Sequence, residues 1–304
     1  MVYDCVIIGG GPAGLNAALV LGRARRSTLL IDSSKPRNAV THASHGFITR
    51  DGVKPAEFRA IAHEELSQYP TVRRLEGEVA GLSSTESGFQ VETAEGEKFA
   101  AGKLILATGL KETFPAIEGF HDFYGKSLFN CPYCDGWELK DKPLVLVTES
   151  NRALHMVKTV YNWSRDLVLC TNGHSIITDE QQRVLSGKGI RVITEPIAAF
   201  LGEEGRLAEV RFAGGSSIAR EGGFVTPQFS QTTSFGEQLG CERNEMGGIV
   251  TDSFGRTSVK GVYAAGDTAV ITPSQLIIAA AEGSRSAIGV NTDLTEEAWE
   301  DLAL

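Results

Sequence analysis

Short apolar runs separated by glycine turns and amphipathic stretches give the first indication of the fold. Residues 3–8 (YDCVII) form an apolar run typical of a buried strand, and GGGPAG comes directly after it. The next stretch, LNAALVLGRARR, has apolar positions at helical spacing, and a second apolar run, STLLIDS, closes on Asp32. This pattern predicts a strand–turn–helix–strand unit with glycines at its turn.

A second unit of the same kind begins at Leu144. The run LVLV predicts a strand, residues 153–163 predict a helix, and DLVLC predicts the next strand. Three further runs, GIRVIT, RLAEVRF and GGFVT, predict short strands of a smaller sheet. Near the end, GVYAAGD predicts a strand and residues 274–290 a long apolar helix, and the acidic TEEAWEDLAL is expected to be a short surface helix or a frayed tail.

The repeated pattern predicts an α/β fold with two Rossmann-like, three-layer ββα nucleotide-binding domains. With 304 residues, the chain exceeds the usual size of one domain. We predict a discontinuous first domain, residues 1–113 and 247–304, and an inserted smaller domain, residues 114–246. The crossings are expected at residues 113–119 and 244–248, where glycine or proline interrupts the pattern.

Composition and charge exclude several classes of protein. Hydrophobic residues make up 42% of the chain and charged residues 22%, and no apolar run is long enough to span a bilayer. The formal net charge of −9 disfavours nucleic acids and anionic membranes as partners. Asp4 interrupts the N-terminal apolar run, so no signal peptide is expected and a cytoplasmic location is predicted.

The first glycine turn matches the GxGxxG fingerprint of a dinucleotide site. Gly9 permits a sharp turn, Gly11 lets the backbone approach a pyrophosphate, and Gly14 permits close packing of the helix on the strand. Asp32, at the end of the next strand, is placed to accept hydrogen bonds from ribose hydroxyls. The surrounding strands and helix make a glycine turn that binds nothing the weaker interpretation.

Two further motifs identify the dinucleotide. YAAGD, with Gly266 and Asp267, is followed by PSQLIIAAAEG and resembles the second FAD signature of two-domain flavoprotein disulfide reductases. ATG at residues 107–109 resembles the middle motif of the same proteins. Three motifs in the expected order predict FAD rather than NAD.

The CPYC segment, Cys131 to Cys134, is the predicted redox element. Two thiols separated by two residues can close a small disulfide and exchange with a substrate. The other three cysteines stand alone and no histidine pair has ligand spacing, so we expect no metal site, although two inert buried thiols are an alternative. Asp135 can act as the proton carrier of the exchange, or it can be an ordinary acid in a helical first turn.

With these motifs in register, nearly the whole chain resembles the low-molecular-weight thioredoxin reductase family. RNAVTHASHGFITRDGVKP and CPYCDGWE are most similar to the branch of gliotoxin- and holomycin-type dithiol oxidases. The resemblance implies that Cys134 faces the flavin, that Cys131 exchanges with substrate, and that the protein is a homodimer. The predicted catalytic residues are Cys131, Cys134 and Asp135. The predicted FAD site consists of Gly9, Gly11, Pro12, Ala13, Gly14, Asp32, Arg37, Asn38, His45, Val79, Ala107, Thr108, Gly109, Gly266, Asp267, Gln275 and Leu276.

Two positions depart from these families. Asp135 stands where the oxidase branch commonly carries His, and it is the residue that thioredoxin reductases use. Ser274 replaces the arginine that thioredoxin reductases usually place before Gln275. The proton carrier and the contacts near the flavin are therefore the parts that the resemblance leaves open.

The strand LVLV leads into Thr148, Glu149 and Ser150, whereas NADPH-using relatives have a glycine fingerprint there. Side chains hold the backbone away from a pyrophosphate, and a like charge a few ångströms away costs about 1 kcal/mol or more. The basic cluster that holds a 2′-phosphate in these relatives is replaced by CTNG at residues 170–173. A degenerate NAD(P)H-type domain is therefore predicted.

Taken together, the motifs predict an FAD-dependent thiol–disulfide oxidoreductase that does not use NADPH. Its substrate is a dithiol or disulfide, either a small molecule or a thioredoxin-like protein. The electron partner is O2, as in a dithiol oxidase, or ferredoxin, as in a disulfide reductase. The alternatives are an NADPH-dependent thioredoxin reductase and a non-enzymatic FAD-binding redox sensor or scaffold.

Overall fold

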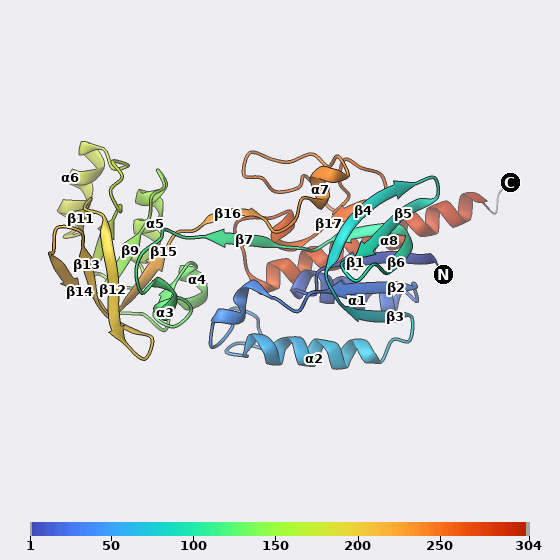
Figure 1. The fold of residues 1–304 in the computed structure, drawn as a ribbon, viewed down its shortest axis with the longest axis horizontal. Helices are drawn as coiled ribbons and strands as arrows, with labels where there is room; N and C mark the ends of the chain where they lie inside the picture. Colours follow the sequence, from blue (N-terminus) through green and yellow to red (C-terminus); the bar gives the residue numbers. More distant parts are fainter. Residues whose placement is uncertain (1, 302–304) are drawn as a thin grey trace. The chain divides into compact units, whose positions relative to one another are not determined.

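The computed structural model describes residues 2–301, which divide into two compact units (Figure 1). The first unit comprises residues 2–39, 46–111 and 229–301, and the second comprises residues 40–45 and 112–228. Both units are α/β and are built on parallel sheets, which confirms the predicted fold class.

The first unit is a three-layer structure around a seven-stranded sheet of order β3-β2-β1-β6-β5-β4, with β17 also paired to β6. Helices α1, α2 and α8 belong to this unit, together with the short elements η1, α7 and η2. The bounds are β1 Val2–Ile8, α1 Pro12–Arg23, β2 Thr28–Asp32, η1 Arg37–Val40, α2 Pro55–Ser67, β3 Val72–Glu76, β4 Val79–Thr85, β5 Gly88–Thr93, β6 Lys98–Leu106, α7 Phe235–Gln238, β17 Val262–Ala264, η2 Gly266–Thr268 and α8 Leu276–Asp301.

Strand β1 is buried on both faces because other layers cover each side of the sheet. It pairs in parallel with β2 and β6. Alternate residues of β1 enter two different cores. Val6 belongs to the same buried cluster as Phe89 of β5, whereas Ile7 belongs to the same buried cluster as Leu21 of α1. This explains why the sequence shows a continuous apolar run here instead of an alternating one.

Helix α8 begins at Leu276 and continues to Asp301, well past the predicted end at residue 290. Its last turns are held by side chains of the sheet layer: Lys103, which is only 6% exposed, pairs with Glu297 at 2.6 Å, and Arg256 pairs with Asp293 at 2.5 Å. Through residue 301 the acidic segment therefore continues α8 and is not a separate helix or a frayed tail; residues 302–304 lie outside the described part.

The second unit contains a five-stranded parallel sheet of order β11-β10-β9-β15-β8 and a three-stranded antiparallel sheet, β12-β13-β14. The strands GIRVIT and GGFVT predicted for a smaller sheet thus join the parallel sheet, and only RLAEVRF lies in the antiparallel one. The bounds are α3 Phe120–Phe123, β8 Leu128–Phe129, α4 Pro132–Asp135, β9 Leu144–Val147, α5 Ala153–Val160, β10 Leu167–Cys170, α6 Asp179–Gly187, β11 Arg191–Ile193, β12 Ile197–Glu203, β13 Arg206–Phe212, β14 Ser217–Ala219 and β15 Gly222–Val225.

The chain passes between the units near β7, Leu110–Thr113, and β16, Gln228–Gln231, which pair with each other. The first crossing agrees closely with the predicted boundary at residue 113. The second differs, because residues 229–246 belong to the first unit rather than to the inserted one. Phe235 and Cys241 are buried in the first unit's core, and the Asn244 side chain accepts hydrogen bonds from two nearby backbone N–H groups, so NEMGG is a local turn and not a crossing.

None of the helices within residues 2–301 is both long enough and apolar enough to cross a membrane.

Candidate functional site

The glycine turn between β1 and α1 is shaped by very close backbone contacts. Gly9 has φ +105°, and an added Cβ would lie 2.3 Å from the Ala107 carbonyl oxygen. A Cβ on Gly14 would lie 1.8 Å from the Gly9 carbonyl oxygen. A Cβ on Gly11, the N-cap of α1, would meet no protein atom within 4 Å. The turn is therefore packed tightly behind and open in front, at the start of a helix, as a bound pyrophosphate requires.

Asp32 lies at the end of β2 and is fixed by two partners. Its Oδ1 accepts a hydrogen bond of 3.0 Å from the Gly10 N–H, and its Oδ2 pairs with Arg59 Nη2 at 2.5 Å. Arg59, on α2, also donates to the Gly10 carbonyl oxygen at 3.2 Å. The sequence alone did not predict this role for Arg59, because one arginine in a charged helix carries no motif. The arginine holds the acid and the glycine turn together.

The second glycine motif brings Asp267 close to Arg37. Arg37 Nη2 donates to Asp267 Oδ2 at 2.7 Å and to Ser274 Oγ at 2.9 Å. Ser274 therefore accepts a hydrogen bond from Arg37. Gly266 has φ +66°, and an added Cβ would lie 2.9 Å from the Ala13 side chain, which joins this motif to the first turn.

The ATG segment comes after β6 and is fixed by hydroxyl groups. The Gly109 N–H donates to Thr268 Oγ1 at 2.7 Å, and Thr108 Oγ1 lies 3.5 Å from the same oxygen. The Ala107 N–H bonds to the Ile8 carbonyl oxygen at 2.9 Å. The structure thus gathers the three predicted glycine motifs at the carboxyl ends of β1, β6 and β17.

Most of the remaining predicted flavin-site residues lie in this same unit. Pro12 and Ala13 open α1, Asn38 lies in η1, Val79 begins β4 and is buried, and Gln275 and Leu276 lie at the start of α8. His45 is the exception, because contacts assign it to the second unit. There its Nε2 lies 3.7 Å from Glu138 Oε1.

Cys131 and Cys134 form a disulfide around the first turn of α4. Cys131 is the N-cap, and its carbonyl oxygen accepts hydrogen bonds of 3.1 Å from the N–H groups of Cys134 and Asp135. The turn lies against Trp163, because a Cβ on Gly136 would approach that ring to 2.7 Å. Tyr133 and Trp137 beside the disulfide are both 68% exposed. The other three cysteines are buried free thiols.

Asp135 is a buried acid with a strongly perturbed pKa. Its pKa is raised to about 7, chiefly by burial and also by the charge of Glu138, whereas the charge of His45 acts in the opposite direction. An acid that titrates near neutral pH can both give and take a proton at that pH. Residues 2–301 contain no group of three or more His, Cys, Asp or Glu side chains that could hold a metal ion.

Side chains occupy the loop that follows the carboxyl end of β9 in the second unit. Thr148 is 1% exposed, and Glu149 Oε1 accepts a hydrogen bond of 2.7 Å from Asn172, which lies just after β10. The Asn172 side chain also accepts from the Ile197 N–H at 2.9 Å. Glu149 and Ser150 line a pocket of about 170 Å³, smaller than the roughly 300–1,000 Å³ usual for small-molecule sites.

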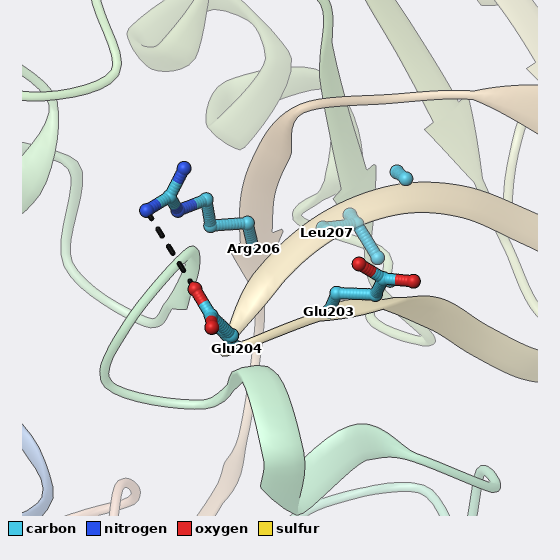
Figure 2. Close-up of a pocket in the computed structure, with 6 residues that line it drawn as sticks. Glu203, Glu204, Arg206 and Leu207 are labelled. Carbon is cyan, nitrogen blue, oxygen red and sulfur yellow. Dashed lines mark ion pairs between the residues drawn. The ribbon is translucent and has the colours of Figure 1, made fainter.

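A larger hollow, about 460 Å³, lies at the β12–β13 hairpin. It is lined by Gly202, Glu203, Glu204, Arg206, Leu207 and Ala208. Figure 2 shows Glu204 and Arg206 pointing toward one another, with their charged groups 3.9 Å apart. Both side chains are about 85% exposed, so this ion pair contributes at most about 1 kcal/mol. The hollow contains no reactive group, and we assign no chemistry to it.

Comparisons with known proteins identify the family. A model of the pyridine nucleotide-disulphide oxidoreductases matches residues 3–283. The chain belongs to this family. Thioredoxin reductase tcpT of Claviceps purpurea is 32% identical over 88% of this chain and 86% of its own length.

Two solved structures are similar over almost all of both chains. The Bacillus anthracis protein TrxB, which carries the name thioredoxin reductase, is 50% identical with a TM-score of 0.93, over 97% of this chain and 99% of that one. HlmI is 36% identical with a TM-score of 0.94, over 99% of this chain and 95% of that one. This pyridine nucleotide-disulphide oxidoreductase is therefore a thioredoxin reductase-like enzyme.

FAD is the cofactor of this pyridine nucleotide-disulphide oxidoreductase, as in its thioredoxin reductase relatives. The residues of the first unit fit it, because the space in front of Gly11 is open and the turn is too tight behind for any side chain. Among the described residues, the geometry adds Arg59 to the predicted set.

Proposed function

We propose that this protein is an FAD-dependent thiol–disulfide oxidoreductase that exchanges two electrons with a dithiol or disulfide substrate and does not use NADPH. The observation that carries the proposal is the Cys131–Cys134 disulfide at the start of α4, followed directly by a buried acid with a pKa of about 7. Free thiols elsewhere in the chain are buried, so this pair is the one suited to exchange.

The exchange can be written with its atoms and electrons balanced. A substrate thiolate attacks Cys131 Sγ, the Cys131–Cys134 bond breaks, and Cys134 leaves as a thiolate. The second substrate thiolate attacks the substrate sulfur of the mixed disulfide, which releases oxidised substrate and the Cys131 thiolate. The substrate thus loses two protons and two electrons. Asp135 takes one proton, and solvent takes the other.

Bound FAD supplies the two-electron redox chemistry that restores the disulfide from the dithiol, with Cys134 as the flavin-side sulfur. The residues proposed to hold it are those of the three glycine motifs and their neighbours. Asp32, oriented by Arg59, is placed for ribose hydroxyls, and the open N-terminus of α1 is placed for the pyrophosphate. Arg37 and Asp267, which are hydrogen-bonded to each other, complete the proposed set.

The loop after the carboxyl end of β9 supports a cycle without NADPH. A dinucleotide there would need to approach the backbone at Thr148–Ser150, where the Glu149 carboxylate already lies bonded to Asn172. An anion in this position opposes phosphate binding by about 1 kcal/mol or more, and the small adjoining pocket offers no compensating volume. Both effects act against a pyridine nucleotide.

Two electron partners are compatible with this chemistry. In the oxidase direction O2 accepts the electron pair, and in the reductase direction a ferredoxin-type donor delivers electrons one at a time. The same cysteines serve both directions, with a small dithiol or a thioredoxin-like protein as substrate. A homodimer and a cytoplasmic location remain predictions.

Anaerobic mixing experiments test this proposal. A small dithiol should bleach the flavin stoichiometrically, whereas NADPH should not bleach it on the same time scale. Cys134→Ser should abolish the dithiol reaction, and Cys241→Ser, which alters a buried thiol of the first unit, should retain it.

Rapid stoichiometric bleaching by NADPH would contradict the NADPH-independent cycle. Bound FAD that no dithiol bleaches would instead indicate a sensor. Oxygen consumption with the dithiol then separates an oxidase from a ferredoxin-linked reductase.

A further inference from the structure

A histidine and a glutamate lie close to the buried acid beside the redox disulfide. Asp135 ends α4 and is 9% exposed, whereas Glu138, three residues later, keeps 42% of its side chain exposed. His45, from the short segment 40–45 that belongs to the second unit, places Nε2 at 3.7 Å from Glu138 Oε1. The two groups whose charges act on the buried Asp135 are thus paired with each other, and both keep part of their side chains exposed to solvent.

The arrangement matters because Asp135 has little contact with water of its own. The charge state of a buried carboxyl depends on its desolvation and on the charges near it. Among residues 2–301, the charged groups that act on Asp135 are Glu138, on the turn that continues from α4, and His45, from segment 40–45. They have opposite effects, and they are paired with each other.

We propose that His45 and Glu138 are positioning residues for Asp135, and that this imidazole–carboxylate pair controls when the buried carboxyl takes up or releases a proton during thiol–disulfide exchange. This rests on the proposed function, because it assigns Asp135 to that exchange. When a dithiol is oxidised, the proton that Asp135 accepts is passed toward solvent on the exposed Glu138 side; in the reverse direction it returns by the same groups. No oxidant beyond the disulfide is needed for this step.

The proposal also assigns an imidazole to Asp135 from outside the local sequence, which has no histidine near the disulfide. Position 135 is an aspartate, and no histidine lies between the disulfide and position 154. The fold supplies His45 from a distant part of the sequence. His45 was predicted only as a flavin-lining residue, so its contact with Glu138 is new information from the structure.

The test measures the protonation of Asp135 without relying on turnover. The flavoprotein is reduced anaerobically with a phosphine, and the rate of alkylation of Cys131 by iodoacetamide is followed from pH 5.5 to 9. The inflection due to Asp135 is the one that Asp135→Asn removes. Glu138→Gln should move this inflection to lower pH and His45→Gln to higher pH, each by about 1 pH unit. His155→Gln, which removes an exposed imidazole on α5, should leave it in place.

Opposite shifts support the pair, since general damage to the fold would move both variants in the same way. Unmoved inflections, or shifts in the same direction, overturn the proposal. Failure of the proposed function gives a different result: the wild-type flavin would not be bleached by any dithiol, while the alkylation profiles would still report on His45 and Glu138.

Discussion

After β1 the chain enters α1 through three glycines, whereas after β9 it enters α5 through Thr148, Glu149 and Ser150. The residue at the end of the second strand differs as well. In the first unit Asp32 is held by Arg59 and faces the glycine turn, and in the second unit Asn172 occupies the corresponding loop and bonds to Glu149. The loops after these two parallel strands therefore differ in character: the backbone of the first is open in front of Gly11, and the second carries a carboxylate that is bonded to Asn172.

Under the proposed function, a nucleotide-type fold and a nucleotide site are separable. The parallel strands are fixed by buried apolar side chains, such as Val6 in one unit and Val145 in the other, which are insensitive to the residues of the loop after the strand. Binding depends on a few backbone atoms at the strand ends. A few side chains at those ends are enough to change it while the core remains intact.

The largest expected effect comes from adding side chains to the first glycine turn. Gly14→Ala would place a Cβ 1.8 Å from the Gly9 carbonyl oxygen, so the turn must open and the first unit should lose both FAD and stability. Gly11→Ala is the matched control, because its Cβ meets no protein atom within 4 Å. It should fold with a free energy of unfolding within about 1 kcal/mol of wild type and still bind FAD poorly.

Flavin absorbance after gel filtration and urea denaturation of the apoprotein separate these two outcomes. Normal FAD retention in Gly11→Ala would show that the open space in front of the turn is not the pyrophosphate site.

The next effect concerns Asp135, the buried acid of the second unit. Burial raises the pKa of Asp135 to about 7, so the folded protein holds a proton that the unfolded chain releases near pH 4. The folded state therefore loses stability as pH rises from about 4 through about 7, by at most about 4 kcal/mol. Asp135→Asn has no such proton to lose.

The variant should gain stability relative to wild type as pH rises, with the difference growing by roughly 2–3 kcal/mol between pH 5 and pH 8. Urea unfolding at the two pH values measures this. An equal difference in the free energy of unfolding at the two pH values would mean that the pKa of Asp135 is not raised in the folded protein.

The smallest effect comes from removing the carboxylate in the loop after β9. Glu149→Ala removes the carboxylate that accepts from Asn172, and with it about 1 kcal/mol of repulsion toward a phosphate. NADPH affinity should rise by only about 5-fold, because Thr148 and Ser150 still keep the backbone away. Fluorescence titration with NADPH checks this, with Glu203→Ala at the β12–β13 hairpin as a control. A gain of several hundred-fold would show that charge alone keeps NADPH out.

Local patterns explain which parts could be predicted from the sequence. The first β–α–β unit, the glycine motifs and the CPYC pair depend on neighbouring residues, and the structure brings the glycine motifs together at the carboxyl ends of β1, β6 and β17. Arg59 and Glu138 could not be found in this way, because their partners lie in distant or unmarked segments. The second crossing was misplaced for a related reason: NEMGG looks like a linker, but the residues before it, such as Phe235, pack into the first unit's core.

Helix α8 supports the first glycine turn from a part of the chain that is far from that turn in the sequence. The Asn16 side chain of α1 bonds to the Ala280 carbonyl oxygen, and Gly283 lies so close to α1 that an added Cβ would approach the Ala13 carbonyl oxygen to 2.0 Å. The first turn thus takes its support from a segment that is synthesised after the inserted unit. During synthesis the inserted unit can fold while its host is still incomplete, and the first turn gains this support only after residues 276–283 have been made.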